Sequence, residues 1–422
     1  MNTTGVEAYI REQEAELARR ERQLPFAEAE YRDRLTRLRE RMAADRIDVL
    51  LLTAPDAMCW LHGYTNRWYR QHSSTRFPPV HCTVVRADDD RTVLIEPAYH
   101  EQLVRLTSCV DEFIGVEGTA GEPTVTDFVH VLTAELSGPR TPSASGRPYG
   151  RIGVESWSSV PNPAVAQVVA SALTARGATV VDASAAVRGV RRIKSPAEIA
   201  VIERAQAACD AGVRHLYANA RPGMTELEAW NQLMTGVIAA GGEPTAMHET
   251  VAAGPPMPVL HGLSSRRPIG PGELFHPDAA AAVDRYHARL TRPFSMGEPP
   301  KALTRLTEIA AGAYDVVLST ARVGLPFREL HRALRVYFAE SGAADGWAGG
   351  YELGVSFMPD WVGEFCWDIE DGEIEDVIEA GLVTNFESCA FVAVVDTVVF
   401  EETGPRFLSS VPRETLVVGD AR

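Results

Sequence analysis

The sequence lacks the marks of disulfide-stabilised, membrane-spanning and nucleic-acid-binding proteins. Its six cysteines are scattered without a C-x-x-C pair, which is typical of buried thiols in a reducing compartment rather than a disulfide framework or zinc site. No apolar run approaches the length of a membrane span. The net charge of -16 disfavours nucleic acid and anionic membranes as partners. The polar N-terminal segment has no apolar signal-peptide core, so we expect a cytoplasmic protein.

The length and the order of sequence patterns predict two domains behind a short arm. At 422 residues, the chain is longer than one hydrophobic core usually supports. Residues 1–25 are a charged helical arm with too few apolar positions to pack by itself. Helical and strand patterns alternate over residues 26–190, which is typical of an α/β domain.

A long amphipathic helix is predicted to open the second domain just after Val190. In the segment KSPAEI, Ser195 is a good N-cap and Pro196 suits the first helical turn. Glu198 completes a capping box with Ser195. Helix pairs segregated from strands follow through residues 191–422, and this order favours an α+β domain.

Six motifs together resemble the creatinase/prolidase family. They are RRIKSPAEI, RPGMTELE, VAAGPPMPVLH, residues 278–292, GLVTNFES and DTVVFEETGPRFLS. Each motif is weak by itself, whereas six in the family's order and at its intervals are specific. The resemblance covers nearly the whole chain and implies an α/β N-terminal domain plus an α+β pita-bread catalytic domain. The pieces RYHARLTR and MPDWVGE bring the chain nearest to the creatinase and ectoine-hydrolase branch.

The resemblance also implies that the family's two-metal centre is largely lost. The metallopeptidases of the family bind two ions through two Asp, one His and two Glu. These positions match, in order, Asp278, Arg289, Tyr351, Glu387 and Val395. An arginine is always protonated and offers no lone pair, and divalent cations need several oxygen or nitrogen donors. We therefore expect neither a metal nor another cofactor.

The resemblance assigns acid–base catalysis to His261, which stands seven residues after Gly254 at the position of the family's catalytic histidine in creatinase. The alternative is a turn histidine bound to a backbone carbonyl. Asp278 and Glu387 would point into one cavity, where two carboxylates repel and burial raises at least one pKa. Either the Arg289 guanidinium fills the former metal space between them, or it turns outward and a cationic substrate supplies the charge.

Further substrate-binding candidates come from both domains. Tyr351 stands where the family ligates metal, and Glu364 lies in a loop that could cap the site. The set is Arg289, Tyr351, His287, His248 and Glu364, with Trp68, Tyr69, Arg70 and Arg76 in the segment GYTNRWYRQHSSTRFPP. In creatinase the corresponding loop reaches the neighbouring subunit's active site. The resemblance therefore implies a homodimer whose N-terminal loop contributes to the partner's site.

We expect metal-independent hydrolysis of a non-peptide C–N bond in a small guanidino, amidino or cyclic amidine molecule. His261 would exchange the proton, while Asp278 and Glu387 would orient the cationic nitrogens as catalytic residues. Creatine itself is disfavoured, because the creatinase branch carries a glutamate where this chain has Thr291. Three alternatives stay open: a lyase acting by proton abstraction and elimination, an Xaa-Pro metallopeptidase, and a non-catalytic binding protein.

Overall fold

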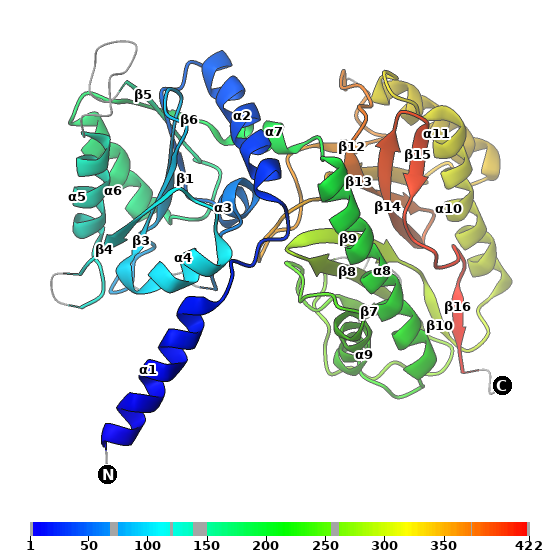
Figure 1. The fold of residues 1–422 in the computed structure, drawn as a ribbon. Helices are drawn as coiled ribbons and strands as arrows, with labels where there is room; N and C mark the ends of the chain where they lie inside the picture. The colour runs from blue at the N-terminus through cyan, green and yellow to red at the C-terminus, as the bar shows by residue number, and fades with distance from the viewer. Residues whose placement is uncertain are drawn as a thin grey trace. The chain divides into compact units, whose positions relative to one another are not determined.

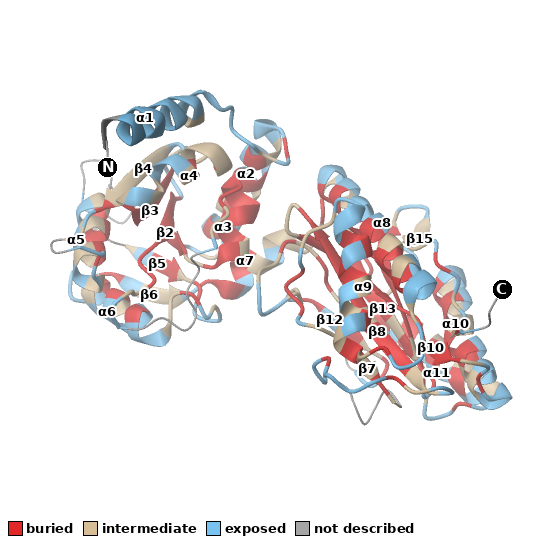
Figure 2. Cartoon of the chain, turned by 90° about the horizontal axis from the view of Figure 1, so that it is seen from below, coloured by how far each residue is buried: buried red, intermediate tan, exposed pale blue. Residues whose placement is uncertain are grey.

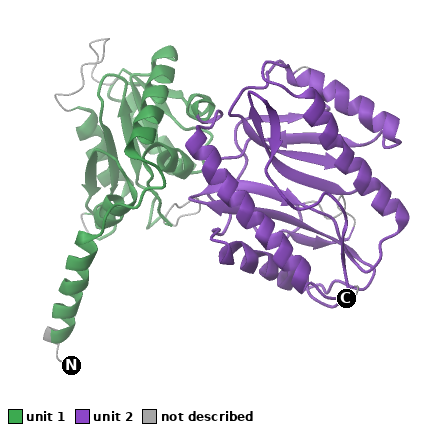
Figure 3. Cartoon of the chain, turned by 45° about the vertical axis from the view of Figure 1, so that its right-hand side comes forward, with its two compact units in different colours: residues 1–190 green, residues 191–422 purple. Residues whose placement is uncertain are grey.

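The computed structural model describes residues 3–67, 75–118, 121–137, 150–254, 261–372 and 374–419 (Figure 1). The chain divides into two compact units, residues 1–190 and 191–422 (Figure 3). Among the described residues, none of the helices is both long and apolar enough to cross a membrane.

Unit 1 is an α/β domain preceded by an exposed helix. Helix α1 (Thr3–Arg19) exposes Val6 and Tyr9 by 62% and 59%. The described part of the unit has a six-stranded sheet in the order β4-β3-β2-β1-β5-β6. Its strands are β1 (Val49–Leu52), β2 (Cys82–Arg86), β3 (Thr92–Pro97), β4 (Glu112–Val116), β5 (Arg151–Val154) and β6 (Thr179–Asp182). The strand pairs are parallel except β1–β2 and β2–β3.

Helices cover both faces of the unit 1 sheet (Figure 1). The helices are α2 (Glu28–Ala44), α3 (Pro55–His62), α4 (Glu101–Thr107), α5 (Val125–Leu136), α6 (Pro163–Thr174) and α7 (Ser184–Arg191). A 3₁₀ turn, η1 (Ala98–His100), precedes α4. The apolar residues of α5 and α6 form one core with inward residues of the strands. Apolar strands buried beneath helices are the expected arrangement of an α/β domain, and the predicted class is confirmed.

Unit 2 is the predicted α+β domain. Its helices are α8 (Pro196–Asn219), α9 (Glu226–Ala239), α10 (Lys301–Thr320) and α11 (Phe327–Ser341). The predicted capping box at Ser195 is present, because its side chain accepts from the Glu198 backbone and the Glu198 side chain accepts in return. Thr225 and Glu228 form an equivalent box at the start of α9. These reciprocal hydrogen bonds satisfy amide groups that a helix start otherwise leaves unpaired.

The described strands of unit 2 form one ten-stranded sheet. Its main path is β12-β11-β13-β14-β9-β8-β10-β16, with β15 paired to β14 and β7 paired to β8. The strands are β7 (Val251–Ala253), β8 (Leu274–Val283), β9 (Tyr286–Thr291), β10 (Phe294–Met296), β11 (Trp347–Tyr351), β12 (Cys366–Asp368), β13 (Val383–Cys389), β14 (Ala393–Glu401), β15 (Gly404–Phe407) and β16 (Leu416–Val418). Strand β8 pairs antiparallel with both β9 and β10, and the two pairings continue one register.

The helices of unit 2 cover a single face of this sheet. Leu290 on β9 and Phe386 on β13 are both register partners of Asp396 on β14, so all three side chains share a face. Leu290 belongs to the core under α8 and α9, and Phe386 to the core under α10 and α11. Figure 2 shows these helices with buried inner and exposed outer surfaces. The opposite face of the sheet is not covered by these helices and is therefore the face on which a polar functional site can form.

A buried cluster of charged side chains connects neighbouring segments on the helix-covered face of the sheet. Arg292 and Asp396 are both 0% exposed and form an ion pair of 2.9 Å. Arg413 donates to the second carboxylate oxygen of Asp396 at 2.9 Å. The Arg292 guanidinium also donates to the backbone carbonyls of Val395 and Val411. This network satisfies the buried charges, which are costly when they lack partners.

Candidate active site

Strand register places the two predicted catalytic carboxylates in one row on the uncovered face. Asp278 on β8 is paired with Thr291 on β9. Thr291 is paired in turn with Val395 on β14, which is paired with Glu387 on β13. Directly opposed residues of neighbouring strands point to the same side of a sheet. The side chains of Asp278 and Glu387 are 41% and 23% exposed, so both remain accessible to a ligand.

Arg289 lies between the two carboxylates. Its side chain is 3% exposed, is ion-paired with Asp278 and lies 4.0 Å from Glu387 Oε1. It also donates a hydrogen bond to the Tyr351 hydroxyl. Thr291 Oγ1 donates to the same Asp278 oxygen at 2.8 Å. This is the first of the two arrangements considered from the sequence, and the outward-turned arginine is excluded.

Electrostatics at the site follow from burial around a fixed cation. Burial raises the pKa of Glu387, and Asp278 adds to that rise, whereas Arg289 opposes it. Burial by itself would lower the pKa of Arg289, but the neighbouring Asp278 raises it overall, so the guanidinium stays charged. Burial also raises the pKa of Tyr351, which keeps its phenol protonated. The site thus combines a permanent cation with a carboxyl group that is easier to protonate than usual.

Tyr351 and Asn385 join the arginine to Glu387. The Tyr351 hydroxyl accepts from Trp361 Nε1 at 2.9 Å, and the Arg289 guanidinium lies 5.7 Å from the Tyr351 ring. The Tyr351 backbone amide donates to Asn385 Oδ1 at 2.7 Å. Asn385 Nδ2 donates in turn to Glu387 Oε1 at 2.6 Å. Sequence reasoning missed Asn385, although its place two residues before Glu387 on a strand puts both on one face.

His287 is fully buried and has no ring nitrogen left for a substrate. Its Nε2 accepts from the Ala246 amide at 2.9 Å, and its Nδ1 donates to the Arg285 carbonyl at 2.9 Å. Burial lowers its pKa to about 3, so the ring is neutral. Its observed contacts hold backbone rather than ligand. His248 and Glu364 are exposed side chains outside the buried cluster.

Of the remaining predicted residues, the structure describes His261 and Arg76. His261 is exposed and has a φ of 63°. Arg76 is exposed, with its guanidinium 5.4 Å from the Phe77 ring. Trp68, Tyr69 and Arg70 lie outside the described residues.

His276 is a second residue that sequence reasoning missed. It precedes Asp278 by two positions on β8, so strand alternation places both side chains on the uncovered face. It is 7% exposed, and neither ring nitrogen has a hydrogen-bond partner among the described residues. Burial lowers its pKa to about 4, against smaller opposing effects of Asp278 and the Gly254 backbone. The i, i+2 spacing from Asp278 was the available sequence signal.

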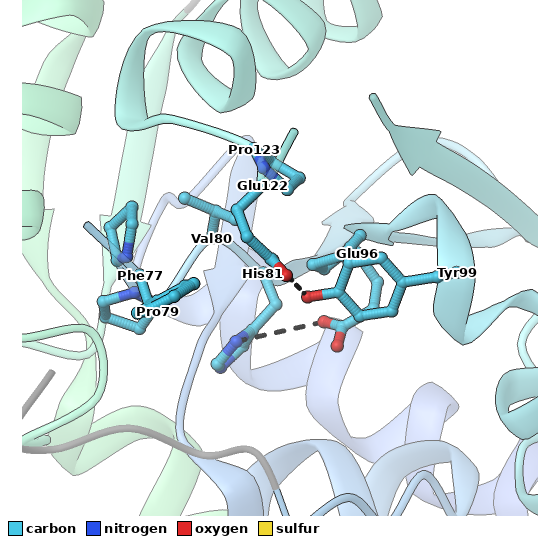
Figure 4. A pocket seen from close by; sticks show the side chains of 10 residues that line it. Phe77, Pro79, Val80, His81, Glu96, Tyr99, Glu122 and Pro123 are labelled. Atoms are coloured by element: carbon cyan, nitrogen blue, oxygen red, sulfur yellow. Dashed lines mark hydrogen bonds and ion pairs between the residues drawn. The ribbon is translucent and has the colours of Figure 1, made fainter. Parts of the chain in front are cut away.

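Unit 1 holds a separate polar cluster around the buried Glu96 (Figure 4). Glu96 is 2% exposed, and its Oε1 accepts from Tyr64 at 2.9 Å and from His100 at 2.7 Å. His81 points toward the other oxygen at 3.9 Å (Figure 4). The adjoining pocket of about 10 Å³ has the size of one water molecule. The hydrogen bonds of this cluster connect β3 with Tyr64 after α3 and with His100 at the end of η1.

Comparison with known families identifies the fold and its relatives. Residues 34–193 match the Creatinase/Prolidase N-terminal domain, and residues 200–402 match Metallopeptidase family M24. The chain belongs to the creatinase/prolidase family. The family resemblance and both predicted domain folds are thereby confirmed, and the chain stands among the M24-family hydrolases.

The relatives have different activities. An uncharacterised hydrolase or peptidase of Sinorhizobium fredii is 25% identical, over 93% of this chain and 99% of its own length. The ectoine hydrolase of Halomonas elongata is 24% identical, over 93% of this chain and 98% of its own length. An Xaa-Pro dipeptidase of Pyrococcus furiosus is 26% identical over 54% of this chain and 66% of its own length.

A solved X-Pro aminopeptidase structure shares the fold. The enzyme from Thermotoga maritima superposes with a TM-score of 0.71 at 20% identity, over 91% of this chain and 99% of the other. At this identity, the likeness concerns the fold and not the substrate.

The side chains present do not fit the two metal ions that the family implies. The guanidinium of Arg289 lies against Asp278, where a bridging cation would have to sit. At the positions where the family resemblance implies two further donors stand Tyr351 and Val395, and Val395 has no side-chain lone pair. Within the described ranges, no group of three His, Cys, Asp or Glu side chains is placed to hold a metal ion. A second cation beside Arg289 would also face direct charge repulsion.

Proposed function

We propose that this protein is a metal-independent hydrolase that cleaves a non-peptide C–N bond in a small amidine, guanidine or cyclic amidine. The observation that carries the proposal is the Arg289 guanidinium between Asp278 and Glu387. It supplies the positive charge that the two carboxylates require, at the place where the family's peptidases bind metal. The likeness to ectoine hydrolase over 93% of the chain supports this class of substrate.

The charge balance favours a singly charged cationic substrate. When both carboxylates are ionised, Arg289 neutralises one of them and leaves one negative charge. An amidinium or guanidinium offers one positive charge and N–H donors in a plane, which suits carboxylate acceptors. Asp278 and Glu387 both remain partly exposed and can accept such donors. The pair would orient the substrate nitrogens and stabilise charge that develops on them during attack by water.

The proton steps are proposed to run through a histidine. In hydrolysis, water forms a bond to the carbon of the C–N group while a base takes one of its protons. The C–N bond then breaks, and the departing nitrogen receives that proton. His261 stands at the family's motif position for this role. In this proposal Tyr351 and the Arg289 guanidinium hold the polar end of the substrate.

A turnover assay tests the proposal. Purified protein is incubated with ectoine, creatine and an Xaa-Pro dipeptide, with EDTA or with added Mn²⁺, and its metal content is measured. We expect hydrolysis of a non-peptide C–N bond that EDTA leaves unchanged. Xaa-Pro cleavage that depends on Mn²⁺ would overturn the proposal in favour of the metallopeptidase alternative. In oxygen-18 water, product without label would instead establish elimination.

We also propose a cytoplasmic homodimer in which the N-terminal loop contributes to the partner's site. Support comes from α1, where Val6, Tyr9 and Ile10 expose 62%, 59% and 48% of their surface. Such apolar side chains on a helical arm are suited to contact with a second copy of the chain. Light scattering after gel filtration should give twice the 46.0 kDa chain mass. A monomeric mass at micromolar concentration would overturn this part.

A further inference from the structure

We propose that His276 contacts the substrate directly, by holding the attacking water and accepting its proton. The inference rests on the proposed C–N hydrolase function and assigns to the buried His276 the proton step that the motif position assigns to His261, whose side chain is exposed. His276 is buried on the face that carries Asp278, and neither ring nitrogen is hydrogen-bonded within the described part of the chain.

The polar side chains at strand positions next to His276 are committed elsewhere. Thr291 Oγ1 donates to the Asp278 carboxylate at 2.8 Å. Thr250 Oγ1 donates to the Asp278 backbone carbonyl at 2.7 Å. Directly opposite His276 on β7 stands Ala252, whose methyl group offers no hydrogen bond. On the other side, the register of β9 and β10 brings Pro293 opposite His276, and this residue has no polar side-chain atom either.

A buried imidazole without a hydrogen-bond partner lowers the stability of the fold unless a bound molecule supplies that partner. The great majority of buried polar side-chain atoms in proteins have a hydrogen-bond partner, because a buried polar group left without one has lost its hydrogen bonds to water and gained none. The neighbouring strand side chains are apolar or already engaged. The Gly254 backbone lies close enough to raise the pKa of the ring slightly, but neither ring nitrogen forms a hydrogen bond with it or with any other described residue. A water or substrate atom bound at the site is therefore the natural partner of the ring.

The spacing suits a small molecule held at both ends. Residues two apart on one strand are separated by roughly 7 Å along it, which is about the span of a substituted five- or six-membered ring. A substrate whose cationic group is bound by Asp278 can therefore reach His276 with its other end or with the water that attacks it. His276 and Asp278 come from the same strand, so the backbone of β8 fixes their separation.

The chemistry balances without any further reactant. A neutral ring nitrogen of His276 accepts one proton from water while the water oxygen forms a bond to the substrate carbon. The C–N bond breaks, and the nitrogen leaves with the proton that His276 returns. The ring ends in its starting state, and no electron acceptor is needed.

Kinetics of two substitutions give the first test. His276→Gln and His276→Asn keep polar amides of similar size, whereas His130→Gln is the matched control because His130 is exposed on α5 in unit 1. With ectoine or another amidine that the enzyme hydrolyses, we expect kcat to fall about 10²- to 10⁴-fold in the His276 variants, with a smaller change in KM. Thermal unfolding checks that each variant is folded. A folded variant with wild-type kcat would overturn the inference.

Binding gives a second test that does not depend on turnover. The protein carries ¹⁵N- and ¹³C-labelled histidine, and the His276 ring signals are those lost in either His276 variant. Acetamidinium chloride is then titrated into the wild-type enzyme. We expect the His276 ring signals to shift, and those of His130 to stay unchanged. Unmoved His276 signals in an enzyme that hydrolyses amidines would overturn the inference and leave the proposed function standing. Shifted signals in a protein that hydrolyses no C–N bond would refute the proposed function, while the contact between His276 and the amidinium would stand.

Discussion

Replacement of Arg289 by methionine removes the cation that holds Asp278 and Glu387 together, while keeping a long apolar stem. Loss of one partner from a buried ion pair costs about 3–5 kcal/mol. Here the remaining carboxylates are 41% and 23% exposed, so water screens part of the charge left behind. Because this screening reduces the cost, we expect the free energy of unfolding to fall by about 2 kcal/mol at pH 7.

The loss should depend on pH in a defined direction. Burial already raises the pKa of Glu387, and Arg289 opposes that rise. Without the guanidinium the pKa rises further, so the folded variant keeps a proton that the unfolded chain releases near its usual value. A group whose pKa is higher in the folded state than in the unfolded state stabilises the fold at pH values below its unfolded pKa. That stabilisation is lost as the pH rises through the folded-state pKa. The difference from wild type should therefore be larger at pH 8 than at pH 5.

Urea denaturation at both pH values measures this difference. Arg332→Met is the matched control, because Arg332 is 68% exposed and pairs with the surface residue Glu329. It should change the free energy of unfolding by less than about 0.5 kcal/mol. If Arg289→Met costs no more than this control, or costs equally at pH 5 and pH 8, the assignment of Arg289 as the counter-ion of the two carboxylates is refuted.

Three further predictions concern residues around the same sheet. Asp396→Ala leaves Arg292 buried without its carboxylate and should lower the free energy of unfolding by about 3–5 kcal/mol, measured by urea denaturation. Glu387→Gln should reduce amidine turnover at least about 10²-fold with little change in thermal stability, since it removes a charge but keeps the shape. Because the pKa of buried His287 is lowered to about 3, its contribution to stability should be lost as pH falls below about 6.5, the unfolded value. Stability curves of wild type and His287→Asn should thus converge between pH 7 and pH 4.

Local sequence signals predicted the frame of the molecule well. The predicted capping box at Ser195 is present, because it depends on residues three positions apart and on no distant contact. The family and the classes of both domains were predictable because six motifs recur in a fixed order along the chain. The replaced metal-ligand positions were visible for the same reason, since an arginine or a valine at a ligand position has the same chemistry in any conformation.

The direction of side chains on strands was not predictable from local signals. His287 was predicted to bind substrate, whereas the structure buries it between the Ala246 amide and the Arg285 carbonyl. Asn385 and His276 were overlooked, although each stands two residues from a predicted catalytic carboxylate. A shift of one residue in pairing would turn every side chain of a strand to the opposite face. Such a choice depends on which strands pair and in which register, and that is settled by contacts distant in sequence.

The sequence by itself determined which chemical groups this protein possesses: two carboxylates retained, three metal donors replaced, and an arginine that is charged at any physiological pH. Only the tertiary structure decided where those charges meet. The register of β8, β9, β14 and β13 brings Asp278 and Glu387 into one row and places Arg289 between them. The physical reason is that an ion pair depends on separations of a few ångströms, which strand pairing creates between residues far apart in the chain.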